Sequence, residues 1–172
     1  TELDKLVKFY GDQLDELHVP FNFKLHWEAE WNAQEMRQII EEYYSLMPDG
    51  GMPNFVIGSH DRKRPATRFG RANTRAAMLL LLTLWGVPTI YYGDEIGMVD
   101  VDIPRELWQD PWGVNNPDAN ISRDTQRTPM QWDNSPNAGF APPYAKPWLP
   151  LAPDYETVNV AAQDRNPRSM LN

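Results

Sequence analysis

The chain has 172 residues, of which 41% are hydrophobic and 12% aromatic, and this composition can bury a sizeable core. Its 24 acidic and 16 basic residues give a net charge of −8, which argues against nucleic acid and anionic membrane surfaces as partners, because both bind basic patches. There is no cysteine, so disulfides, thiolate metal ligands and cysteine nucleophiles are excluded.

Five elements are predicted between residues 20 and 92. Alternating apolar and polar residues predict a short strand over 20–25, and Asn32 with Glu35 forms a helix-capping pattern before a helix that ends near 48–51. Aromatic and β-branched residues predict a strand over 55–57, an apolar helix follows over 73–85, and a third strand is predicted over 89–92. This alternation with short connections predicts parallel strands joined by crossover helices.

The apolar run over 76–92 is interrupted by Gly86-Val-Pro88 after about ten residues, whereas a bilayer span needs roughly 20. We therefore expect a buried helix, a turn and a strand there, in a soluble chain with no membrane partner. Nothing at the start resembles a signal peptide, so a cytoplasmic location is expected. Thr1 stands where an initiator methionine would be, and either end of the natural protein may lie outside the sequence.

From residue 94 to residue 172 the periodicity is lost among prolines and tryptophans, which predicts a long ordered loop region or a small subdomain. Three parallel strands and two helices cannot close a barrel or cover an open sheet. The sequence is consistent with a small three-layer domain having an extra edge, and more so with a fragment of a larger α/β fold.

Polar residues follow the predicted strand over 55–57. His60 and Asp61 come at its carboxyl end, where α/β enzymes keep their chemistry, and Arg64 and Arg68 follow one helical turn apart. The carboxylate could stabilise developing positive charge or bind sugar hydroxyls. The alternative is a loop-capping aspartate, an exposed histidine and an ordinary cationic surface.

Two further clusters are candidates. Asp94 and Glu95 end the next strand and could pair with Asp61 as acid and nucleophile, or could merely anchor the following loop. Residues 123–133 combine arginines, an amide and Trp132, which suits a carbohydrate ring, although Trp132 could equally be core. The three histidines, at 18, 26 and 60, lack ligand spacing and no phosphate loop is present, so no metal and no cofactor is expected.

Several long motifs resemble the α-amylase superfamily, glycoside hydrolase family 13, and within it the α-glucosidase and oligo-1,6-glucosidase branch. Residues 57–64, Ile-Gly-Ser-His-Asp-Arg-Lys-Arg, with Thr-Arg-Phe-Gly over 67–70, resemble its strand-7 motif. Residues 86–98 resemble the strand-8 motif, and 17–23 the strand-6 region. Arg-Thr-Pro-Met-Gln-Trp-Asp over 127–133, with 147–150 and 159–160, resembles the long strand-8 loop of the glucosidase branch.

The resemblance implies an α/β fold comprising part of a (β/α)8 barrel, strands 6 to 8 with two crossover helices. Residues 1–98 would be the carboxyl-side part of the barrel, and 99–172 the long irregular strand-8 loop or subdomain, ending before the last helix. The whole protein would be a retaining glycoside hydrolase acting on small α-gluco-oligosaccharides, of maltose or isomaltose type. The family also contains transglycosylases and isomerases such as trehalose synthase, and noncatalytic heavy subunits of amino-acid transporters.

The resemblance also implies roles for individual residues. Asp61 would stabilise the transition state and His60 would donate to the same glucose unit, while Arg64, Arg68 and Arg127 would bind substrate or position these groups. In the family the nucleophilic aspartate follows strand 4 and the acid/base glutamate follows strand 5, so neither would lie on this chain, and the chain alone would be inactive. The resemblance therefore replaces the catalytic pairing of Asp61 with Asp94 or Glu95 by one with an aspartate and a glutamate outside this chain. One departure is Ser59, where the family usually has asparagine.

Overall fold

The computed structural model describes residues 2–27 and 31–172. It contains two compact units: residues 1–57 with 76–90 form the first, and residues 58–75 with 91–172 form the second. Within the described ranges, every helix is too short or too polar to cross a membrane. The cytoplasmic location and the boundary at residue 98 stay predictions.

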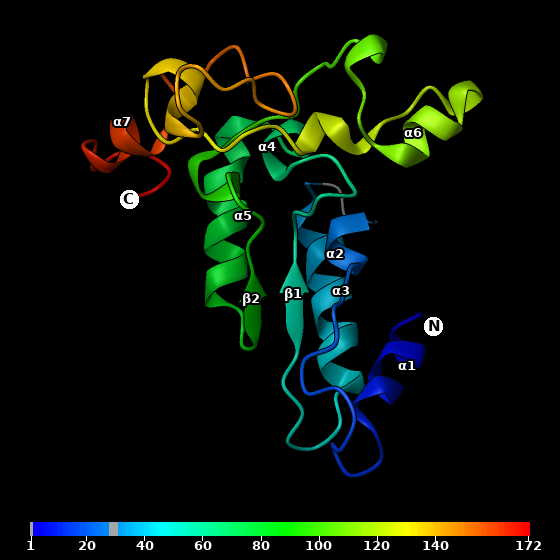
Figure 1. The fold of residues 1–172 in the computed structure, drawn as a ribbon. Helices are drawn as coiled ribbons and strands as arrows, with labels where there is room; N and C mark the ends of the chain where they lie inside the picture. The colour runs from blue at the N-terminus through cyan, green and yellow to red at the C-terminus, as the bar shows by residue number, and fades with distance from the viewer. Residues whose placement is uncertain (1, 28–30) are drawn as a thin grey trace. The chain divides into compact units, whose positions relative to one another are not determined.

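The first unit is built on two short parallel strands. Strands β1 (Asn54–Val56) and β2 (Val87–Thr89) lie side by side, with Asn54 opposite Val87 and Val56 opposite Thr89 (Figure 1). The Asn54 side-chain amide donates to the Val87 carbonyl at 3.2 Å and to the Thr89 hydroxyl at 2.8 Å, which fixes this register. The predicted parallel pairing of these two strand regions is therefore confirmed.

Helix α3 (Ala33–Leu46) begins as the sequence predicts. The Asn32 side chain accepts hydrogen bonds from the amides of Gln34 and Glu35, at 2.9 and 3.1 Å, and so pairs two amides that the helix itself leaves free. The helix buries Tyr43, whose ring meets Phe55 of β1 edge-on at 5.6 Å. The remaining helices of this unit are α1 (Glu2–Leu6), a 3-10 helix (Val7–Tyr10), α2 (Lys24–Trp27) and most of α5 (Arg71–Thr83).

Two sequence predictions are corrected in this unit. The strand predicted over 20–25 is wrong, because the Asn22 side chain accepts from the Lys24 amide at 3.0 Å and starts the short helix α2. The strand predicted over 89–92 lies earlier, at Val87–Thr89, because the Val87 amide donates to the Pro53 carbonyl at 2.8 Å. Gly86 has φ of 140° and lies so close to Pro53 that a Cβ there would overlap the Pro53 carbonyl.

The second unit is an ordered region of short helices, as the loss of periodicity predicts. It contains α4 (Pro65–Arg68), the first turn of α5, α6 (Pro111–Asn115) and α7 (Val160–Asp164). Five 3-10 helices lie at Asp94–Ile96, Arg105–Leu107, Pro117–Ala119, Arg123–Gln126 and Pro136–Gly139. Small apolar clusters support it: Ile96, Met98 and Met130 in one, and Val101, Ile103 and Ala152 in another.

Candidate functional site

Asp61 lies at the start of the second unit, shortly after β1 in the chain. Gly58 brings the backbone so near Asp94 that a Cβ there would overlap the Asp94 carboxylate, so any larger residue would require that side chain to move. The Asp61 amide donates to the Ser59 hydroxyl at 3.2 Å. Ser59 thus supplies a side-chain hydrogen bond to this turn, although the family usually has asparagine at that position.

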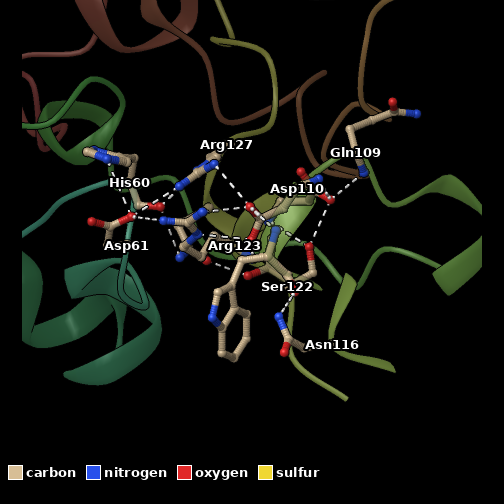
Figure 2. Close-up of polar contacts among 12 residues, drawn as sticks. His60, Asp61, Gln109, Asp110, Asn116, Ser122, Arg123 and Arg127 are labelled. Atoms are coloured by element: carbon tan, nitrogen blue, oxygen red, sulfur yellow. Dashed lines mark hydrogen bonds and ion pairs between the residues drawn. The ribbon is translucent and has the colours of Figure 1, made fainter. Parts of the chain in front are cut away.

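The Asp61 carboxylate is held by a cationic cluster (Figure 2). Its Oδ1 accepts from Arg123 Nη1 at 3.0 Å and from Arg127 Nη2 at 3.1 Å, and the Nε2 atom of His60 lies 3.4 Å away. Arg127 also donates from Nε to the His60 carbonyl at 2.9 Å. The structure therefore brings together three predicted site residues, His60, Asp61 and Arg127, and adds Arg123.

A second carboxylate, Asp110, lies behind these arginines. It is 2% exposed and accepts from Arg123 Nε at 2.9 Å, from Arg123 Nη2 at 2.7 Å and from the Arg123 amide at 3.1 Å. The hydrogen bonds from Arg123 hold the pKa of Asp110 well below its usual range, although burial opposes them. Asp110 also caps α6 by accepting from the Trp112 amide.

The Arg64 side chain is fully buried, whereas a residue that binds substrate directly needs an exposed side chain. Its side chain is 0% exposed, with Nη1 donating to the Tyr92 carbonyl at 2.6 Å and to Asp94 at 3.2 Å. The guanidinium also lies 4.8 Å from the centre of the Tyr91 ring. Further chain can only bury Arg64 more, so of the two roles expected for it the structure favours positioning over direct contact with a sugar.

Asp94 is the partner of Arg64. Burial raises the pKa of Asp94 to about 7, while Arg64 lowers it and the neighbouring charges of Glu95 and Asp100 raise it again. This arrangement agrees with the alternative that Asp94 anchors the loop. Arg68, at the end of α4, lies with its guanidinium 4.6 Å from the centre of the Phe69 ring, and its contact with substrate stays a prediction.

A cavity of about 690 Å³ adjoins Asp61, within the size range of small-molecule sites. Its lining includes Arg62, Asp102, Arg105, Trp108, Arg123 and Gln126. Indole and guanidinium groups offer a flat apolar face beside hydrogen-bond donors, which suits a sugar ring. Trp132 is 50% exposed in this chain, so it is not part of the core of the second unit.

Sequence reasoning missed the roles of Asp110 and Arg123. Two local signals were available: Asp110-Pro111 is a typical helix start, and Arg123 is the first residue of the polar cluster over 123–133. Neither signal reveals that the two side chains pair across 13 residues of chain.

Comparison with known proteins identifies the family. Residues 2–172 match the model of the alpha amylase catalytic domain, so the chain belongs to the α-amylase family. It is 38% identical over its whole length to an alpha-glucosidase of Apis mellifera, and 36% identical over 98% of its length to the human amino acid transporter heavy chain SLC3A1. These matches cover 30% and 23% of the two relatives, so the chain spans less than a third of their length.

A solved structure agrees with this assignment. The crystal structure of the alpha-glucosyl transfer enzyme XgtA superposes with a TM-score of 0.86 and 30% identity, over 99% of this chain and 32% of that one. The parallel strand pair of the first unit is consistent with part of a barrel enzyme of this family.

Proposed function

We propose that this chain is the carboxyl-side part of a retaining α-glucosidase barrel, in which β1 and β2 are strands 7 and 8. The observation that carries this proposal is Asp61, a half-exposed carboxylate held by Arg123 and Arg127 at the edge of a cavity large enough for a sugar. The family relatives named as an alpha-glucosidase and an alpha-glucosyl transfer enzyme support it.

Asp61 acts on the transition state. Cleavage of a glycosidic bond passes through an oxocarbenium-like state, and a fixed carboxylate stabilises its positive charge. The contacts described for this carboxylate all involve Oδ1, so Oδ2 is left for a sugar hydroxyl. His60 donates to the same glucose unit, and Arg127 fixes both residues by binding the His60 carbonyl and the Asp61 carboxylate.

Bond making and breaking belong to two other carboxyl groups. A retaining enzyme needs a nucleophile and an acid/base about 5 to 5.5 Å apart, and the family supplies them after strands 4 and 5. The complete enzyme therefore joins those two groups to Asp61 and releases glucose from α-linked gluco-oligosaccharides through a covalent glycosyl-enzyme.

The decisive experiment is Asp61→Asn in the complete enzyme, assayed on maltose. The amide keeps the shape but lacks the charge, so kcat should fall by about a thousandfold or more. The Asp61 side chain is 42% exposed in the 172-residue chain and the substitution keeps its size, so the thermal midpoint should change little. Asp118→Asn, at an exposed carboxylate of the same unit, serves as the matched control and should retain wild-type kcat. An Asp61→Asn enzyme with wild-type turnover would remove Asp61 from the mechanism.

Two relatives define the competing outcomes. The transfer enzyme suggests that the sugar is passed to another sugar rather than to water, and the transporter heavy chain suggests a role without catalysis. Product analysis with maltose separates them: glucose alone indicates hydrolysis, a rearranged disaccharide indicates transfer, and no product from the complete wild-type protein supports the noncatalytic role.

A further inference from the structure

Arg123 connects a buried carboxylate with an exposed one (Figure 2). Its Nε and Nη2 atoms donate to the two oxygens of Asp110, at 2.9 and 2.7 Å, and its Nη1 atom donates to Asp61 at 3.0 Å. All three guanidinium nitrogens of Arg123 are thus engaged in hydrogen bonds. A planar guanidinium bound at two points cannot turn freely, so its third nitrogen has a fixed direction.

Asp110 itself is fixed from several sides. Its amide donates to Asp124 at 3.0 Å, and its carboxylate caps α6. It also lies 3.8 Å from Arg127 Nη1, so it faces both of the arginines that donate to Asp61. At 2% exposure this carboxylate offers almost no surface for direct contact with a sugar, so its effect on the reaction passes through the residues bound to it, of which Arg123 and Arg127 reach Asp61.

We infer that Asp110 is a positioning residue that aims Arg123 at Asp61 and so sets the orientation of the transition-state carboxylate. This inference rests on the proposed function of Asp61. Asp110 is the buried anchor, Arg123 bridges from it with a forked guanidinium, and Asp61 is the half-exposed acceptor. Because a misplacement of about 1 Å can lower a rate about a hundredfold, loosening the connector should impair catalysis without removing a reacting group.

The test compares Asp110→Asn, Arg123→Lys and the double variant in the complete enzyme. Each single change should lower kcat by about 10- to 100-fold with KM altered less than about threefold, because the reacting geometry and not ground-state binding is affected. The double variant should be no slower than the slower single variant, since both changes break the same connection. Multiplying effects, or an Asp110→Asn enzyme within twofold of wild-type kcat, would overturn the inference.

A control for the stability of the second unit is Asn159→Ala. Asn159 is also buried, at 1% exposure, and its side chain accepts from the Ala162 amide and donates to the Tyr155 carbonyl, both at 2.8 Å, so its described hydrogen bonds involve neither Asp110 nor the two arginines. This variant should lower the melting temperature but leave kcat within about threefold. If Asn159→Ala lowers kcat as much as Asp110→Asn at equal loss of melting temperature, the effect comes from loss of stability and the positioning role is wrong.

Chemical rescue gives a second readout that a purely structural role would not produce. Free guanidinium at millimolar concentration should restore part of the activity of Arg123→Ala, because both carboxylate oxygens of Asp110 can still bind it. It should restore none in Asp110→Asn/Arg123→Ala. Equal rescue in both backgrounds would contradict the role of Asp110. Failure of the proposed function is recognised separately, since Asp61→Asn would then keep wild-type turnover, and the positioning role would be overturned with it.

Discussion

At the scale of single residues, the second unit contains two arginine–carboxylate pairs with opposite character. The carboxylate of Asp110 receives three hydrogen bonds from Arg123, and its pKa is lowered. Asp94 receives one bond from Arg64, on Oδ1, while its buried Oδ2 has no hydrogen-bond partner among the described residues. An unpaired buried oxygen favours the protonated carboxyl, which explains why burial dominates over Arg64 and raises the Asp94 pKa to about 7.

This assignment predicts a pH-dependent stability difference between wild type and Asp94→Asn. The folded pKa of Asp94 is raised from 3.8 to about 7, so the folded state binds the proton more tightly than the unfolded state does. The contribution is therefore fully present at low pH and is lost as the pH rises toward 7, by at most about 1.4 kcal/mol per pH unit. Wild type should gain stability relative to the variant between pH 7 and pH 4 in urea unfolding. A difference independent of pH would mean that Asp94 stays ionised beside Arg64.

At the scale of elements, a helix or strand boundary could be predicted from the sequence where it depends on contacts between residues close together in the chain. The start of α3 was predictable because Asn32 and the apolar spacing after it act within one turn. The position of β2 was not, because its register depends on Asn54 and Pro53, some 33 residues earlier. The strand predicted over 20–25 is wrong because the hydrogen bond that the Lys24 amide donates to the Asn22 side chain outweighs the alternating pattern.

The cap of α3 can be tested directly. Asn32→Ala removes the acceptor for the amides of Gln34 and Glu35 and should lower the free energy of unfolding by about 1 kcal/mol, whereas Asn32→Asp should keep most of it. Urea unfolding followed by circular dichroism measures the difference. Equal stability of the alanine and aspartate variants would show that water satisfies these amides as well as Asn32 does.

At the scale of the whole molecule, the predicted site residue Arg127 meets His60 and Asp61 only through tertiary structure. The position of His60 and Asp61 after a strand was predictable, and the family motifs added Arg127. The clustering of Asp61 with Arg123 and Arg127 depends on contacts across more than 60 residues, which no local pattern encodes. Arg64 was predicted beside the same site, but its full burial was not, because burial follows from packing against Tyr91 and Tyr92.

The last prediction concerns the catalytic activity of the 172-residue chain by itself. Two buried carboxylates of the second unit, Asp94 and Asp110, are each bound to an arginine, and under the proposed function the nucleophile and the acid of the retaining mechanism come from strands 4 and 5 of the complete barrel. The 172-residue chain alone should therefore release no measurable nitrophenol from p-nitrophenyl α-glucoside, while the complete enzyme turns it over. Turnover by the chain alone at a normal glucosidase rate would require a second carboxylate at the same cavity. Asp102 lines that cavity with Asp61, so in that case Asp102→Asn would abolish the activity.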